Sequence, residues 1–152
     1  MKKFLLMLLS WTMLLLGSVS FVSCGDDDDD DNNKSSVPAN ASEAFSKYGS
    51  TKGAKLDGDN VVWVYDQEET NTTMIMVFHY NGANMESGIA YSKFESEEAA
   101  KAYYEAAKAD GSEASIDGNY VTVKSSKGDL AEYEGLDKNS LVAFFNAMNE
   151  YF

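Results

Sequence analysis

Three short runs of apolar and β-branched residues predict three consecutive β-strands in the middle of the chain. They cover residues 61–65, 72–80 and 86–94. Because strand side chains alternate between faces, the second run has two different faces. One face carries Met74, Met76, Phe78 and Tyr80, and the other carries Ile75, Val77 and His79. The Asn81-Gly82 pair tolerates the positive φ of a tight turn, so we expect the second and third runs to form a hairpin.

Three other segments have helical spacing of apolar residues and polar residues that suit helix ends. The first runs from Ser42, its N-cap, to Gly49. In the second, Ser96 is the cap, two acidic residues occupy the positive end of the helix dipole, and Gly111 ends the helix. The third begins at Asp137 and carries on one side Leu141, Phe144, Phe145, Met148 and Phe152. This spacing predicts amphipathic helices that cover a sheet.

A second hairpin separates the last two helices. It turns at Asp117-Gly118, and residues 120–124 form its better strand, whereas residues 49–60 read as a loop. The predicted order of elements is α-β-β-β-α-β-β-α. Strands joined by short turns pair antiparallel, and amphipathic helices cover such a sheet on one side. We therefore predict an α+β fold with an antiparallel sheet of four to five strands and the two main helices packed on one face.

The first 24 residues differ in composition from the rest of the chain and form three zones. Lys2 and Lys3 form a positive start, Phe4 to Leu16 form an apolar stretch, and Gly17 to Ser23 are rich in small residues. This order is typical of a signal peptide. A retained transmembrane helix is the alternative, because Phe4–Val22 is nearly long enough to span a bilayer. Its serines and glycine, however, make it less apolar than most spans.

The signal ends in Phe21-Val22-Ser23-Cys24, which resembles the lipobox of bacterial lipoproteins. Ser23 fits the small residue before the cysteine, whereas Phe21 stands where leucine is commoner. The resemblance implies that diacylglycerol is attached to the Cys24 sulfur, that cleavage precedes Cys24, and that the freed amine is acylated. Two or more acyl chains anchor a protein stably, because each buried methylene contributes about 0.8 kcal/mol. A plain secretory signal is a further alternative.

Six consecutive acidic residues, Asp26 to Asp31, follow closely on the cysteine. An aspartate at the centre of a bilayer costs about 2.5–3.5 kcal/mol, so we expect the chain to leave the membrane at once. The acidic run resembles the export signal of Bacteroidota-type surface lipoproteins, which implies an outer-membrane location facing the exterior. A solvated spacer is the plainer interpretation. We divide the chain into a cleaved signal at 1–23, a lipidated acidic tether at 24–39 and one globular domain at 40–152.

The amino-acid composition limits the classes of partner that we expect the protein to bind. The 152 residues include 12 lysines, no arginine and 25 acidic residues, which gives a net charge of −13 at pH 7. Removal of Lys2 and Lys3 with the signal changes this charge from −13 to −15. Nucleic acid binds mainly through basic side chains on phosphates, so we expect no nucleic-acid partner. Cys24 is the only cysteine, which excludes an intrachain disulfide.

Candidate catalytic and metal-binding groups are few. His79 is the single imidazole, and with no cysteine in the domain the usual zinc sites are excluded. Paired carboxylates, which serve glycosidases or bind calcium, occur at Asp57/Asp59, Glu68/Glu69 and Glu132/Glu134. Residues 57–68 match a calcium-binding loop at positions 1, 3 and 12, but Val61 and Val62 stand where an oxygen ligand and the turning glycine belong. We predict no cofactor and no metal.

Aromatic residues give the most usable hint of a binding surface. Trp63, Tyr65, Tyr80 and Tyr91 lie on neighbouring predicted strands, and a single helical layer covers only one face of a sheet. An uncovered row of this kind stacks on sugar rings or docks a protein partner. The alternative is that the same four residues form the core, and their burial decides between the two.

These observations favour a surface-exposed, membrane-anchored lipoprotein whose small domain binds an envelope protein or a glycan without catalysing a reaction. The alternative is a small extracellular hydrolase that acts on glycans through paired carboxylates. A purely structural envelope component is a third interpretation. A concave pocket with converging carboxylates would favour the hydrolase, whereas a flat or grooved patch would favour the binding module.

Overall fold

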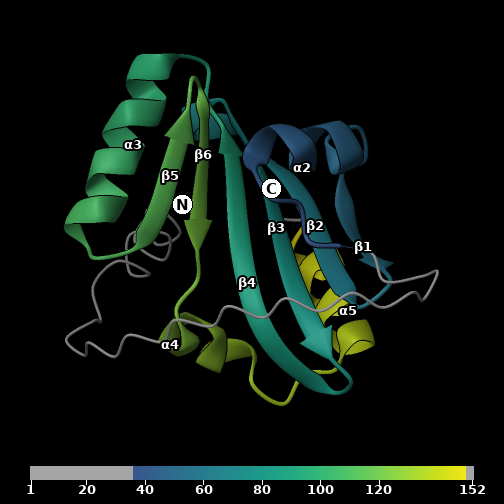
Figure 1. Cartoon of the computed structure of the whole chain (residues 1–152). Coiled ribbons are helices and arrows are strands. Elements are labelled where there is room, and N and C mark those ends of the chain that lie inside the picture. Colours follow the sequence, from purple (N-terminus) through teal and green to yellow (C-terminus); the bar gives the residue numbers. More distant parts are fainter. Residues whose placement is uncertain (1–35, 150–152) are drawn as a thin grey trace.

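A computed structural model describes residues 36–149, so Cys24, the predicted signal and most of the predicted tether lie outside the described residues. One antiparallel sheet of six strands, in the spatial order β1-β2-β3-β4-β6-β5, organises this part of the chain (Figure 1). In chain order the elements are α2 (Ala41–Tyr48), β1 (Gly53–Asp57), β2 (Asn60–Gln67), η1 (Glu68–Thr70), β3 (Thr72–Asn81), β4 (Asn84–Lys93), α3 (Glu97–Ala109), β5 (Glu113–Asp117), β6 (Tyr120–Lys124), α4 (Lys127–Leu130), η2 (Ala131–Tyr133) and α5 (Lys138–Met148). The predicted α+β class with an antiparallel sheet is confirmed.

Three hairpins use the same kind of two-residue loop. Gly58, Gly82 and Gly118 stand first in their loops, with φ of 61°, 63° and 56°. A residue with a Cβ is strained at positive φ, and glycine in this position is typical of type II′ turns, whose twist matches that of the flanking strands. The closing pairs are Asp57 with Asn60, Asn81 with Asn84, and Asp117 with Tyr120.

Both faces of the sheet are apolar at its centre. The two sides predicted for β3 are confirmed, because Met74, Met76, Phe78 and Tyr80 belong to one buried cluster and Ile75 and Val77 belong to another. The first cluster also contains Leu141 and Phe145 of α5. Burial of apolar surface, at roughly 25 cal/mol per Å², is the main stabilising term in such a core.

The two longer helices pack on the same face, as predicted. Asp137 caps α5, since its Oδ1 accepts a hydrogen bond from the Ser140 backbone N–H at 2.8 Å. Ser96 caps α3 in the same way, through the Ala99 N–H at 3.2 Å. Helix α3 packs on β5 and β6. The buried Val121 of β6 lies in register with Ser92, which lies in register with Met74, so α3 covers the face that α5 covers further along the sheet.

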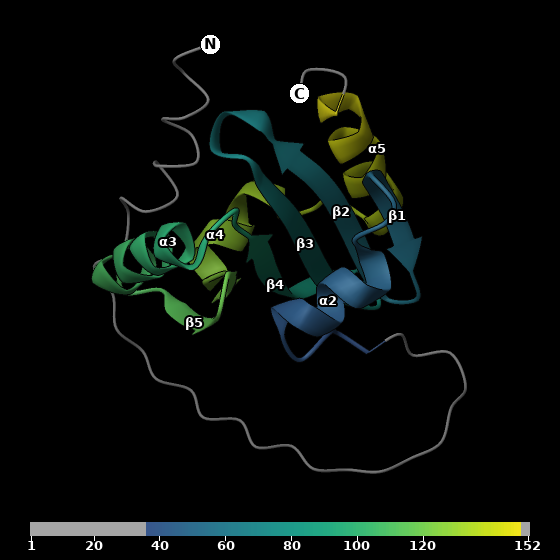
Figure 2. The ribbon, with the colours of Figure 1, turned by 90° about the horizontal axis from the view of Figure 1, so that it is seen from above.

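The opposite face is covered by α2, which overturns the expectation of an uncovered face. Figure 2 shows α2 and α5 on opposite sides of the sheet. Ala41, Ala44 and Tyr48 of α2 pack in the second buried cluster. The N-cap is Asn40 rather than the predicted Ser42: the Asn40 Oδ1 accepts a hydrogen bond from the Glu43 N–H at 2.9 Å.

Two parts of the prediction need correction. The sheet has six strands rather than four to five, because residues 53–57, predicted to lie in a loop, pair with β2 across Gly58. A short helical segment, α4 with η2, precedes α5, and a capping box between Ser126 and Asp129 begins it. Of the apolar residues assigned to the last helix, Leu141 and Phe145 are buried and Phe144 is 45% exposed; Phe152 lies outside the described residues. No helix within residues 36–149 is long and apolar enough to cross a membrane.

Candidate functional site

The aromatic row predicted as a binding platform is buried. Trp63, Tyr65, Tyr80 and Tyr91 are 4%, 5%, 1% and 0% exposed. The platform hypothesis is therefore wrong for these residues, and the alternative that they form the core holds. The reason is that helices cover both faces of the sheet: the first three residues lie in the cluster under α5, and Tyr91 lies in the cluster under α2.

Their polar atoms are also used inside the fold. The Trp63 Nε1–H donates to the Asn149 Oδ1 at 2.9 Å, and the Tyr80 hydroxyl donates to the Leu136 carbonyl at 3.0 Å. The Tyr91 hydroxyl donates to the carbonyl of Pro38. Burial raises the pKa of Tyr65 and of Tyr91. Burial disfavours the charged phenolate, as it does for tyrosines in a core.

The two carboxylates of the Asp57/Asp59 pair interact with different helices. Asp57 accepts a hydrogen bond from the Tyr48 hydroxyl at 2.6 Å and pairs with Lys47 at 3.0 Å, both on α2. Asp59 pairs with Lys138 of α5 at 2.8 Å. One carboxylate is thus directed to each side of the sheet, which is unsuited to joint action on one glycosidic bond. The remaining pairs are exposed: Glu68/Glu69 lie in η1, and Glu132/Glu134 lie in η2 and directly after it.

The described part of the chain contains no assembled metal site, and its single imidazole forms a contact between two strands. Among residues 36–149, no group of three or more His, Cys, Asp or Glu side chains is placed to bind a metal ion. The half-buried His79 forms a hydrogen bond of 2.8 Å between its Nδ1 and the Oδ1 of the buried Asn60. These two residues face each other across β2 and β3, so this imidazole contact links two neighbouring strands.

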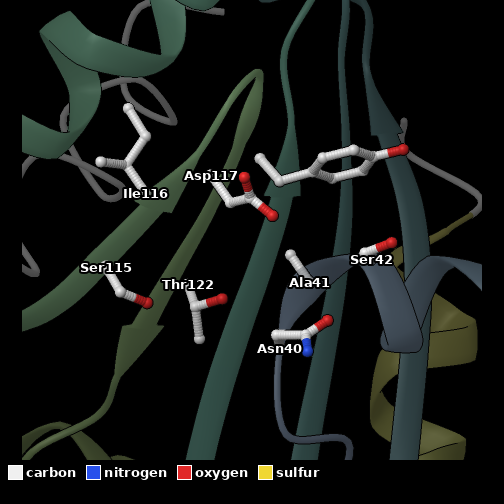
Figure 3. A pocket seen from close by; sticks show the side chains of 8 residues that line it. Asn40, Ala41, Ser42, Ser115, Ile116, Asp117 and Thr122 are labelled. Atoms are coloured by element: carbon white, nitrogen blue, oxygen red, sulfur yellow. The ribbon is translucent and has the colours of Figure 1, made fainter.

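A shallow hollow lies between the start of α2 and the β5–β6 hairpin (Figure 3). Its volume is ≈ 40 Å³, which holds about two or three waters. Small-molecule sites are larger, roughly 300–1,000 Å³. The polar side chains that line it are Asn40, Ser42, Ser115, Asp117, Tyr120 and Thr122. Its lining contains no imidazole or amine, and Asp117 supplies its carboxylate.

Beside the hollow, the hairpin presents a polar surface, and α2 packs against the β6 part of it. We call Glu113, Ser115, Asp117, Thr122 and Lys124 the hairpin surface. Their register places all five side chains on one face of β5 and β6. Glu113 pairs with Lys124. Sequence reasoning predicted this turn but not the surface, although the alternation of polar residues with Ala114 and Ile116 is the pattern of a strand with one solvated face.

Strand β5 is also an edge of the sheet, and its outer backbone groups are open. In a two-residue hairpin the closing pair exchanges hydrogen bonds, and hydrogen-bonded and non-bonded pairs alternate from there. Asp117 closes this hairpin with Tyr120, so Ala114 and Ile116 direct their N–H and C=O groups away from β6. Within the described part of the chain, these groups have no hydrogen-bond partner.

Among the described residues, the opposite edge is blocked at Ala54 but not at Leu56, the other residue of β1 that directs its backbone groups outward. By the same alternation, Ala54 of β1 directs its backbone groups away from β2. There the Asn146 side chain of α5 accepts from the Ala54 N–H at 2.8 Å and donates to the Ala54 carbonyl at 3.1 Å. The amide of Asn146 thus takes the place of a neighbouring strand. Unpaired edges invite association with other chains, and proteins commonly block them. Here the β1 edge is blocked at Ala54, whereas the β5 edge is open at both Ala114 and Ile116.

Comparison with family models, with curated proteins and with solved structures gives no match. The assignment of function therefore rests on the residues of this chain alone.

Proposed function

We propose that this protein is a membrane-anchored envelope lipoprotein whose globular domain is a binding module rather than an enzyme, and that the β5–β6 hairpin binds its partner. The observation that carries the proposal is the difference between the two sheet edges. Asn146 closes the edge at Ala54, whereas the backbone groups of Ala114 and Ile116 are open beside the polar hairpin surface.

A protein partner fits this surface better than a glycan. Sugar-binding sites rely on exposed aromatic rings, and the four aromatic residues that suggested such a site are buried. Open backbone groups at a strand edge instead bind an extended polypeptide. The hollow beside the hairpin has room for about two or three waters, which suits the rim of a protein interface.

The anchoring part of the proposal rests on the lipobox-like sequence that ends at Cys24 and on the acidic run that follows it. Cys24→Ser removes the thioether, so we expect it to abolish labelling by a fatty-acid probe and to block normal processing. Protease treatment of intact cells measures whether the wild-type domain faces the exterior. Unchanged labelling of the serine variant would contradict lipid attachment at this residue.

The binding part is tested by site-specific photo-crosslinking in intact cells. A photoreactive amino acid at the exposed Ser115 reports on the hairpin surface, and one at the exposed Leu56 is the matched control on the β1 edge, which Asn146 blocks at Ala54. We expect a discrete crosslinked protein from position 115 and none from position 56. Equal crosslinking from both positions, or none from position 115, would contradict binding at the hairpin.

A further inference from the structure

We infer that the outer edge of β5 accepts an additional strand from another protein, and that this strand carries basic residues at alternate positions. The inference rests on the proposed function and specifies both the mode of binding and the chemistry of the partner. It follows from three features of β5: its open backbone groups, the two unlike faces of its side chains, and the charges at its two ends.

The open backbone groups fix the mode of binding. Ala114 and Ile116 direct their N–H and C=O groups outward, as the register of the hairpin requires. An added strand that pairs with both residues satisfies these groups and extends the sheet from β5. Strand addition therefore depends on backbone amides of the partner as well as on its side chains.

The side chains fix the pattern of the partner. In an antiparallel pair, residues directly opposite each other lie on the same face. Partner residues opposite Glu113, Ser115 and Asp117 therefore lie on the hairpin surface, and those opposite Ala114 and Ile116 lie on the side of α3. Ile116 is 38% exposed, so an apolar partner residue buries more of it. The sequence of a matching partner strand is therefore basic, apolar, polar, apolar, basic.

Strand β6, which pairs with the inner side of β5, already has nearly the pattern expected of the partner strand. Strand β6 reads Tyr-Val-Thr-Val-Lys and places Lys124 opposite Glu113, Thr122 opposite Ser115, and Val121 opposite Ile116. At the other end of β5, Asp117 has no cationic partner among the described residues. A basic residue on the outer side offers Asp117 such a partner, and the net charge of −13 attracts a basic segment at long range.

A second copy of the same chain fits poorly at this edge. Ala114 and Ile116 provide the outward hydrogen-bonding groups, so antiparallel pairing of two β5 strands is centred on Ser115. This register places Glu113 of each strand opposite Asp117 of the other, on the same face. Like charges directly opposite each other destabilise a sheet. The charges of β5 therefore disfavour self-pairing and favour a basic strand.

The first test measures binding of labelled peptides to the purified full-length chain by fluorescence anisotropy. The probe is a nonapeptide with the core Lys-Val-Thr-Val-Lys between Ser-Thr flanks. The charge control replaces both lysines with glutamate, and the backbone control carries N-methyl groups on both valines. We expect either change to weaken binding at least about tenfold, and added salt to weaken binding of the basic probe. Equal binding of the three peptides would overturn the inference.

The second test changes the protein. Ile116→Pro removes an outward N–H that no ladder bond uses, so the sheet tolerates it while the edge is blocked. Leu56→Pro is the matched control: Leu56 also directs its N–H outward from an edge strand and is 46% exposed. Circular dichroism checks that both variants fold. We expect Ile116→Pro to abolish binding of the basic probe and Leu56→Pro to leave it unchanged.

If Ile116→Pro does not fold, Asp117→Lys replaces it as the test variant. We then expect the charge reversal to weaken binding of the basic probe and to strengthen binding of the glutamate probe. The same variants separate this inference from the proposed function. Crosslinking from position 115 that persists in Ile116→Pro would retain the hairpin as the binding surface but overturn strand addition. Loss of all crosslinking from position 115 in the wild-type background would reject the proposed function itself.

Discussion

Ser92 is a buried hydroxyl in an otherwise apolar part of the sheet. Its side chain is 1% exposed, and its Oγ has no hydrogen-bond partner among the described residues. Its neighbours in register are Met74 and Val121, on the face that α3 and α5 cover. A polar group buried without a partner loses its hydrogen bonds to water and gains none in return.

We therefore expect Ser92→Ala to raise the free energy of unfolding by about 1 kcal/mol. The measurement is urea unfolding followed by circular dichroism. Ser87→Ala is the control, because Ser87 lies on the same strand but is half-buried, and we expect it to change stability by less than about 0.5 kcal/mol. A lower stability of Ser92→Ala would show that the hydroxyl has a stabilising partner.

Trp63 shows why the candidate site was only partly predictable from the sequence. Alternation along a strand assigns residues to two faces, but it does not show which face a helix covers. The ring of Trp63 stacks between Tyr65 at 4.1 Å and Phe145 at 4.3 Å. The contact with Phe145 joins residues that lie 82 positions apart in the printed sequence. Such a long-range contact depends on the position of α5, which local patterns do not define.

Among the elements, β1 was missed because its side chains lack a clear apolar face. Its sequence Gly-Ala-Lys-Leu-Asp leaves four of five residues half-buried and Leu56 exposed. The Asp57-Gly58 pair nevertheless matches Asn81-Gly82 and Asp117-Gly118, which correctly predicted two hairpins. The turn signal was therefore present at all three hairpins, but the first hairpin was missed because the apolar pattern marks only the strands that form the core.

The N-cap of α5 makes a prediction about pH. The Ser140 N–H donates to the Asp137 carboxylate, and this hydrogen bond holds the pKa of Asp137 below its usual value of 3.8. A carboxylate whose pKa is lower in the folded state than in the unfolded state stabilises the folded state at pH values above the unfolded pKa. That contribution is lost as the pH falls through the folded pKa. Helix α5 should therefore weaken in acid.

Asp137→Asn separates the charge from the cap, because asparagine also caps helices but does not titrate in this range. We expect wild type to be the more stable of the two at pH 7, since the carboxylate also favours the positive end of the helix dipole. This advantage should shrink between about pH 5 and pH 3. Urea midpoints of both proteins at several pH values measure it. A difference that does not change with pH would contradict the role of the charge.

The described domain begins with a contact to β4, an inner strand of the sheet. The Tyr91 hydroxyl donates to the carbonyl of Pro38, just before α2 begins. Tyr91 is fully buried in the cluster that includes Ala41, Ala44 and Tyr48 of α2. If the protein is anchored through Cys24, tension on the tether reaches the domain at Val37 and Pro38 and then at Tyr91 of β4.

We therefore expect Tyr91→Phe to loosen the N-terminal part of the domain. The ring still fills its site, but the Pro38 carbonyl loses its donor, which costs about 1–2 kcal/mol of stability. Hydrogen exchange measured on the full-length chain should become faster in α2 and stay unchanged in α5, which packs on the opposite face. Tyr120→Phe is the control, because that hydroxyl bonds to no described residue. Equal exchange in α2 of wild type and Tyr91→Phe would show that packing alone, without this hydrogen bond, fixes the start of the domain.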